Sequence, residues 1–599
     1  MILRASLYMK RRLFMSRRKY LDTKQPKVKS IMGDFILIGI ICLFAFILIV
    51  TQITINQPLS SLPSQSSVDD VKKMHDFLSI GNLAYFSMRT MFRMIVGMMW
   101  SILFSVICGV LAIKFKTARR IILPMVNFLE SVPLLGFMTF TTAFLLGLYP
   151  GNVMGAEALA IFAVFTGQAW NIMLSLYQIM EVVPKDLKEV TSQFRYSAWE
   201  KFWRLEFVYS IPGLLWNLVI SQSAAWFAIV ASEQVTVAIP KSETLILPGI
   251  GSYIQVALDR ADFKACGFAV IALIINVVIL NFLVFQPLVK ATYYYRYDEG
   301  TTQGNPPKSI VYNLVKASNF GKILMKWIQK IKDFWIFKLA RVWYILRINL
   351  IFKYLGKVKK YISIIWYILL GYAVVISAIK LYRFLPHEDF SIIPHLMLLT
   401  TLRVVLAMLI AAAIFTPLGV WVASNKRRLS FIQPIGQVVG SIPSNVYTPF
   451  IVIFISLGYK QLEWWILPLI MVGCQWYYFF NVIAGYLAIP DDIKEVTKIF
   501  PLSKFKWWTR YLIPSMFPYL ITAIINAAGA AWNADIAAES LQWGKETINV
   551  TGLGQYIAVN DGIKDKSALG TLAMCAVVGL CIIFVWQPLY KYAREKFHY

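Results

Sequence analysis

Runs of about 20 apolar residues recur along the whole chain, and the first begins at Phe35 (FILIGIICLFAFILIVTQITI). A helix of that length crosses a hydrocarbon core of about 30 Å. Inside lipid the backbone must satisfy its own hydrogen bonds, which leaves only helices or closed barrels. The alternating ten-residue pattern of a membrane barrel is missing from the sequence. The sequence therefore predicts an all-α integral membrane protein.

The second part of the sequence repeats the first. At an offset of 310 positions, Arg93, Gly109, Pro124, Ser131 and Pro133 recur as Arg403, Gly419, Pro434, Ser441 and Pro443. At an offset of 306, the run 188–191 (KEVT) recurs as 494–497, and Arg204, Pro212, Trp226 and Glu233 recur as Arg510, Pro518, Trp532 and Glu539. The offsets drift by only a few residues over about 200 positions, so the chain is a tandem duplication.

Each half accommodates six spans, and the even number gives both halves the same orientation. We expect the halves to pair about a pseudo-twofold axis along the membrane normal. The predicted spans are 35–55, 94–114, 130–149, 154–180, 210–236 and 266–288 in the first half, and 363–384, 399–422, 441–458, 462–488, 514–538 and 568–589 in the second.

Lys and Arg gather in the loops on one side of this twelve-span arrangement, including the loops around 114–120, 185–204, 426–428 and 494–510. Basic loops remain in the cytoplasm, so both termini are predicted to be cytoplasmic. The predicted domains are a basic arm (1–34), a first half (35–289), a linker (290–362), a second half (363–590) and a tail (591–599). The arm lacks a clear cleavage site, so the first span is read as a retained anchor.

The linker 290–362 holds fifteen Lys or Arg against three Asp or Glu. From about residue 320, lysines interleave with Ile and Trp, which predicts an amphipathic helix on anionic membrane lipid. The net charge of +28 is therefore assigned to the cytoplasmic membrane side and not to nucleic-acid binding. The six cysteines form no CxxC pair and the four histidines form no cluster, so no metal site is predicted.

Two of the basic loops share an exact spacing. In 490–514, Glu495-Val-Thr is followed by three residues, Pro501, nine residues and YLIP. In 184–208, Glu189-Val-Thr is followed by three residues, Arg195, nine residues and LEFV. This pattern resembles the E-A-A-x3-G-x9-I-x-L-P loop of ABC importer permeases. The resemblance implies that both loops dock on separate ATPase subunits, with Glu189, Arg195, Glu495 and Pro501 as coupling residues.

Within that class the sequence resembles the nitrate/sulfonate/bicarbonate (taurine-type) permeases, through NVIAG at 481–485, AW…AE at 531–539 and GLGQYI at 552–557. The resemblance implies a fused type I importer permease for a small anion in a bacterial or archaeal inner membrane. It implies two ATPase subunits and a solute-binding protein as partners. The phosphate-binding GxxxxGK[ST] loop is missing, so we expect ATP only on the partner subunits and no enzyme activity or bound cofactor in this chain.

Polar or aromatic side chains in the central spans are candidates for the substrate pathway. Each could instead join neighbouring helices through hydrogen bonds, and the arginines could extend to the membrane interface. A buried acid in a span needs a partner, so Asp535 is predicted to pair with Arg403. The candidates are Gln168, Asn171, Gln475, Trp226, Trp532, Asn533, Asp535, Arg93 and Arg403.

Two other functions remain open from the sequence. An ion-coupled secondary transporter of twelve spans would also show a twofold repeat, but it would not need the two loops of shared spacing. A non-transporting membrane scaffold or receptor would show no ATP-dependent uptake.

Overall fold

The structure is a computed structural model of residues 1–599. The description that follows covers residues 77–131, 134–149, 153–181, 183–194, 196, 198–238, 247–293, 309–319, 386–442, 444–447, 449–452, 462–499, 502–543, 546–560 and 564–581, with isolated positions at 322–323, 326–327, 330, 372, 376, 379, 383, 584–585, 588–589 and 592.

The first half is a bundle of long apolar helices joined by short ones. Its helices are α4 (Ile80–Lys114), α5 (Lys116–Ser131), α6 (Leu134–Leu148), α7 (Val153–Glu181), α8 (Lys185–Gln193), α9 (Ala198–Lys201), the π-turn η1 (Phe202–Glu206), α10 (Phe207–Ile220), α11 (Gln222–Ala238), α12 (Ile250–Asp259), α13 (Phe263–Leu280), the π-turn η2 (Asn281–Phe285) and α14 (Gln286–Tyr293). In the linker, α15 (Ile310–Ala317) begins at Ser309, whose hydroxyl accepts a hydrogen bond from the Tyr312 amide.

The second half repeats this order. Its elements are η3 (His387–Ser391), α18 (Ile393–Ala423), α19 (Lys426–Gly440), η4 (Ser444–Tyr447), α21 (Leu462–Ala488), α22 (Asp491–Ile499), α23 (Lys504–Lys506), the π-turn η5 (Trp507–Leu512), α24 (Ile513–Ala538), strands β1 (Ser540–Trp543) and β2 (Glu546–Asn549), α25 (Leu553–Val559) and α26 (Lys564–Cys581). The antiparallel pair β1–β2 is a small exception to the predicted all-helical fold and lies in the loop after α24.

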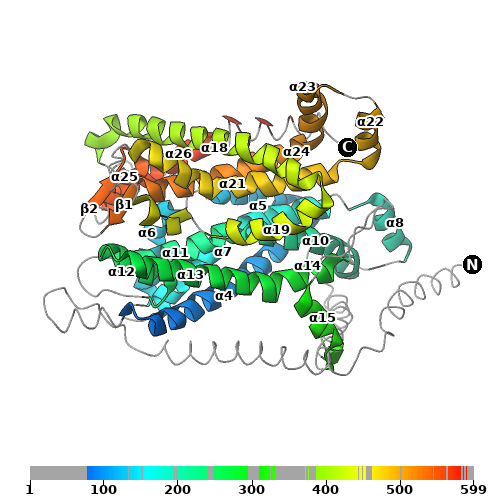
Figure 1. The fold of residues 1–599 in the computed structure, drawn as a ribbon, viewed down its shortest axis with the longest axis horizontal. Helices are drawn as coiled ribbons and strands as arrows, with labels where there is room; N and C mark the ends of the chain where they lie inside the picture. The colour runs from blue at the N-terminus through cyan, green and yellow to red at the C-terminus, as the bar shows by residue number, and fades with distance from the viewer. Residues whose placement is uncertain are drawn as a thin grey trace, which may run out of the picture.

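Equivalent helices pack alike in the two halves. The long helix α4 packs along α7, and α18 packs along α21; α7 then contacts α10 and α11, as α21 contacts α24. The halves also exchange contacts, because α5 lies against α26 and α19 against α13. Each apolar core includes residues of the other half: Ile220 belongs to the second core, and Ile442 and Val446 to the first. The two halves therefore form one packed unit (Figure 1).

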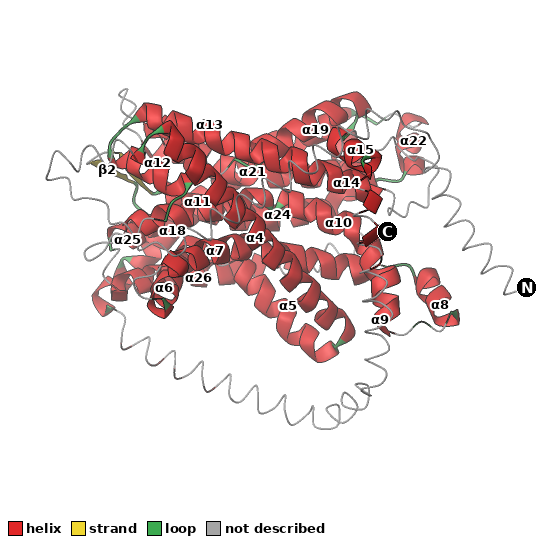
Figure 2. Ribbon diagram, turned by 90° about the horizontal axis from the view of Figure 1, so that it is seen from below, coloured by secondary structure: helices red, strands yellow, loops and turns green. Residues whose placement is uncertain are grey.

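Short helices lie at opposite ends of this unit. Figure 1 shows α8, α22 and α23 at one end of the long helices, and α12, α25 and the β1–β2 hairpin at the other. Figure 2 shows the same separation from a perpendicular direction. The loops that carry the shared Glu-Val-Thr spacing thus lie at one end. Gly249-Ile-Gly251 and its repeat Gly552-Leu-Gly554, at the starts of α12 and α25, lie at the other.

Six described helices, or seven with the bent pair α10–α11, are long and apolar enough to span a membrane. They correspond to seven of the twelve predicted spans. The chain bends by 44° between α10 and α11, within the predicted span 210–236. Span 35–55 lies outside the described residues, and 363–384 and 441–458 are described only in part. Helices α6 and α26 cover most of the two remaining predicted spans.

Candidate functional site

A cavity of about 100 Å³ lies between the two halves. From the first half, α5, α7 and α11 contribute Leu129, Glu130, Thr166, Gly167, Trp170, Asn171, Ser223, Ala224 and Phe227. From the second half, η4, α21 and α24 contribute Ser444, Gly473, Tyr477, Ile525, Asn526, Gly529, Ala530 and Asn533.

Many lining residues are repeat-related pairs. Five pairs separated by 306 positions have both members on the cavity: Gly167 with Gly473, Asn171 with Tyr477, Ser223 with Gly529, Ala224 with Ala530, and Phe227 with Asn533. Equivalent helix surfaces of the two halves therefore meet at this cavity. The cavity lies on the pseudo-twofold axis that relates the halves.

Polar and apolar side chains share the lining, which carries no Lys, Arg or His. Three amides (Asn171, Asn526 and Asn533) share it with the carboxyl group of Glu130. The position 310 residues after Glu130 is Gly440, so the second half has no matching acid. The cavity is therefore chemically asymmetric, although its backbone frame is repeated.

Two of the nine predicted pathway residues, Asn171 and Asn533, line this cavity. Gln168 is fully buried on α7, and no described residue makes a hydrogen bond to its amide. Trp226 and Trp532 are buried within the apolar cores of the first and second halves. Gln475 is partly buried on α21 and does not line the cavity.

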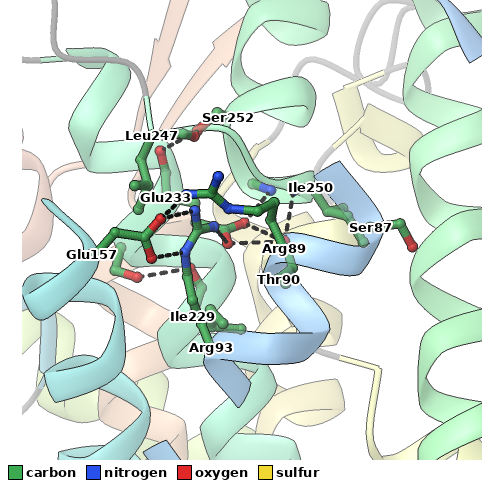
Figure 3. Close-up of polar contacts among 12 residues, drawn as sticks. Ser87, Arg89, Thr90, Arg93, Glu157, Ile229, Glu233, Leu247, Ile250 and Ser252 are labelled. Atoms are coloured by element: carbon green, nitrogen blue, oxygen red, sulfur yellow. Dashed lines mark hydrogen bonds and ion pairs between the residues drawn. The ribbon is translucent and has the colours of Figure 1, made fainter. Parts of the chain in front are cut away.

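Arg93 does not line this cavity but lies in a buried ionic network at the α12 end of the first half (Figure 3). The first Arg–Glu cluster consists of Arg89, Thr90, Arg93, Glu157 and Glu233. Arg93 Nε lies 2.6 Å from Glu157 Oε2, and its Nη1 lies 2.7 Å from Glu233 Oε1. Arg89 also pairs with Glu157. Two bases therefore balance two acids in a site shielded from water.

This cluster ties three helices to the start of α12. The Thr90 hydroxyl donates to Glu233 Oε1 at 2.9 Å and accepts from the Ile250 amide at 3.0 Å. The Gly251 amide donates to Glu233 Oε2 at 2.8 Å. Because Thr90 is on α4 and Glu233 on α11, these hydrogen bonds join both helices to the start of α12.

The second Arg–Glu cluster (Thr400, Arg403, Asp535 and Glu539) repeats most of these contacts. Arg403 Nη1 lies 2.6 Å from Glu539 Oε1, the Thr400 hydroxyl donates to the same oxygen at 2.7 Å, and the Leu553 amide donates to Thr400 at 3.0 Å. The Gly554 amide donates to Glu539 Oε2, as Gly251 does to Glu233.

The predicted Asp535–Arg403 contact is the weaker one made by this arginine. Arg403 Nη1 lies 4.0 Å from Asp535 Oδ1, compared with 2.6 Å from Glu539. Asp535 is fully buried, and no described residue donates a hydrogen bond to either of its carboxyl oxygens. Glu539 is the principal partner because it lies one helical turn beyond Asp535, nearer the guanidinium. Among the described side chains of this cluster, one base faces two acids.

The repeated Gly-x-Gly motifs owe their glycines to these carboxylates. A Cβ on Gly249 would overlap the Glu233 carboxyl group, and a Cβ on Gly552 would overlap that of Glu539. The backbone of both residues is extended, with φ of −169° and −179°, so close approach and not an unusual dihedral angle requires glycine.

The structure thus assigns to these clusters several residues that the sequence did not single out as functional. Glu233 and Glu539 recur at the 306 offset and Thr90 and Thr400 at the 310 offset, so the repeat held the signal. Glu157 also recurs at the 306 offset, as Glu463. Arg89 and the cavity residue Glu130 could not have been found this way, because Leu399 and Gly440 stand at their equivalent positions.

The two loops of shared spacing form similar surfaces at the other end of the molecule. Glu189 lies on α8 and Glu495 on α22, nine-residue helices at equivalent positions, and both side chains are exposed. Arg195 and Pro501, at the position of the pattern glycine, lie outside the described residues.

Comparison with known proteins identifies relatives that match part of this chain. The chain is 27% identical over 183 residues to the nitrate import permease protein NrtB of Leptolyngbya laminosa, covering 30% of this chain and 61% of the relative. It is 26% identical over 155 residues to the bicarbonate transport system permease protein CmpB of Synechococcus elongatus, covering 26% and 52%. The matched region thus spans about half to three fifths of each relative. These relatives are transport permeases and not enzymes.

The profile of one membrane-protein family matches the chain twice, at residues 101–287 and 415–597. The two matches coincide with the two halves of the sequence repeat, and the predicted tandem permease fold is confirmed. Because the matches cover more than half of the sequence, the chain belongs to the family of binding-protein-dependent transport system inner membrane components.

Proposed function

We propose that this chain supplies both membrane halves of the permease of an ATP-driven importer, and that the cavity between its halves is part of the path of a small anion. The observation that carries the proposal is the set of five repeat-related residue pairs around that cavity. In a duplicated membrane protein, the pseudo-twofold axis is where a path shared by both halves can run. The nitrate and bicarbonate permeases among the relatives support the anion class.

The energy source is a pair of separate ATPase subunits that dock on α8 and α22. Their exposed glutamates and their location at one end of the bundle support this assignment. Glu189, Arg195, Glu495 and Pro501 are the coupling residues, and ATP is bound only by the partners. A solute-binding protein delivers the anion at the α12–α25 end. The docking end then faces the cytoplasm of a bacterial or archaeal cell, with both termini on that side and the basic linker on membrane lipid.

The test is nitrate and bicarbonate uptake by the chain reconstituted with its ATPase and solute-binding protein. Asn533→Phe copies the residue of the equivalent position, Phe227, and narrows the cavity. We expect it to reduce uptake at least about ten-fold while the ATPase stays bound. Leu409→Phe changes a side chain that is 63% exposed on α18 and serves as the control.

Two results would contradict the proposal. Unchanged uptake by Asn533→Phe would remove the cavity from the path. Uptake that needs an ion gradient and no ATPase would favour the secondary transporter instead.

A further inference from the structure

An ion pair attaches the first coupling loop to the long helix α4. Lys114 is the last residue of α4, and Glu206 ends the π-turn η1 that follows α8 and α9. Lys114 Nζ lies 2.6 Å and 2.8 Å from the two carboxylate oxygens of Glu206. The Glu206 side chain is only 6% exposed and that of Lys114 is 27% exposed.

The second half has an apolar contact at the same place. The residue 310 positions after Lys114 is Ser424, and the residue 306 positions after Glu206 is Leu512. Leu512 is fully buried and belongs to an apolar cluster with Val420, Val482 and Met516. The position that carries a buried charge in the first half therefore carries a packed leucine in the second.

A second ion pair of the first half also has uncharged residues at the equivalent positions of the second half. Arg119 Nη1 lies 3.7 Å from Glu181 Oε1 and joins α5 to the end of α7. The equivalent residues of the second half are Leu429 and Leu487. Both pairs of charged residues in the first half therefore have uncharged equivalents in the second, but only the Lys114–Glu206 pair is short and nearly buried.

The two kinds of contact respond differently to force. A nearly buried carboxylate is costly without its partner, so Glu206 and Lys114 must move together. The apolar contact of Leu512 has no preferred direction and carries no charge, so it constrains its neighbours through shape alone. Because α4 packs along α7, and α7 lines the cavity, a displacement of η1 that moved α4 would also move a wall of the cavity.

We propose that Lys114 and Glu206 are a positioning pair that transmits movement of the first coupling loop to α4, a role that no ion pair serves at the equivalent positions of the second half. The inference rests on the proposed docking of ATPase subunits at α8 and α22. It predicts that the two loops are coupled to the path unequally, even though both bind an ATPase.

The experiment measures nitrate imported per ATP hydrolysed by the complete complex in proteoliposomes, together with the amount of ATPase bound. Glu206→Gln keeps the shape of the side chain and removes its charge. We expect it to lower the transport ratio at least about three-fold, an effect between those of an exposed and a buried pair, with ATPase binding unchanged. Exchanging the charges, with Lys114→Glu and Glu206→Lys together, should restore most of the ratio.

Arg119→Gln is the matched control, because its ion pair is longer and more than a third exposed on both sides. It should leave the ratio unchanged. A Glu206→Gln variant with lowered thermal stability but a normal ratio would overturn the inference and leave the pair a structural role. If the wild-type complex imports no nitrate or binds no ATPase, the proposed function fails instead.

Discussion

Gly552 lies where one additional carbon atom would occupy the space of the Glu539 carboxyl group. Gly552→Ala should push that carboxylate away from Arg403 and destabilise the protein by about 1–3 kcal/mol, the usual cost of overpacking. Thermal unfolding in detergent measures the change. Gly267→Ala is the control, since nothing lies within 4 Å of the new methyl group there. Equal effects of the two variants would show that the Gly-x-Gly motif has no packing role.

Asp535 and Glu539 should respond in opposite ways to loss of charge. Glu539→Gln weakens the main partner of Arg403 and should cost about 3–5 kcal/mol, as for other broken buried pairs. Asp535→Asn relieves a site in which one arginine faces two acids, so stability should stay the same or rise. Unfolding of both variants and of the double mutant checks this. A large loss of stability in Asp535→Asn would instead make Asp535, at 4.0 Å, the principal partner of Arg403.

At the scale of secondary-structure elements, the two coupling loops differ in how much of the permease pattern they keep. The second loop ends in YLIP and the first in LEFV, without the proline. We expect Glu495→Ala to reduce uptake more than Glu189→Ala, because the fuller pattern should bind its ATPase more strongly. Both glutamates are exposed, so folding should be unaffected. Wild-type uptake by both variants would exclude these glutamates from coupling.

The carboxylate of Asp389 joins η3 to α25 and α26. The Tyr556 hydroxyl donates to Asp389 Oδ2 at 2.6 Å, and Lys566 Nζ lies 3.0 Å from the same oxygen. The hydrogen bond from Tyr556 and then the contact with Lys566 lower the pKa of Asp389. The ionised Asp389 side chain therefore contributes its full stabilisation above the ordinary Asp pKa of about 3.9. This stabilisation is lost as the pH falls through the lowered pKa of Asp389.

Asp389→Asn should accordingly be less stable than wild type at pH 7, and the difference should shrink as the pH falls below about 4. Melting temperatures measured from pH 7 to pH 3 test this. Glu388→Gln changes the exposed neighbour and should show no such trend. A difference between Asp389→Asn and wild type that is independent of pH would contradict the assignment.

At the scale of the molecule, one chain supplies both halves of the permease. The two family matches and the contacts exchanged between α5 and α26 and between α19 and α13 indicate a complete pair. One chain should therefore bind two ATPase subunits, one at each coupling loop. The mass of the purified complex measures the ratio. Two copies of this chain for each ATPase pair would be incompatible with the proposal.

Sequence periodicity and the repeat predicted the architecture well, because both depend on many residues. The bounds of α21 agree with the predicted span at both ends, and those of α7 and α24 agree to within one residue.

The functional sites were harder to predict from the sequence, since a polar residue on an apolar helix can face a cavity, another helix or an ion pair. Asn171 and Gln168 are three residues apart on α7, yet only Asn171 reaches the cavity. Arg93 was predicted near an entry path, but Glu157 and Glu233 surround it, and only the packing of three helices reveals this.

The central cavity has Phe227 on one wall and Asn533 at the equivalent place on the other. In a homodimeric permease a single mutation alters both walls at once, so any benefit on one side must outweigh its effect on the other. Fusion of the two genes removes that constraint, because each codon then encodes one wall only. Glu130 and its repeat equivalent Gly440 differ in a way that a symmetric dimer could not acquire. The duplicated chain can therefore evolve its path one side at a time.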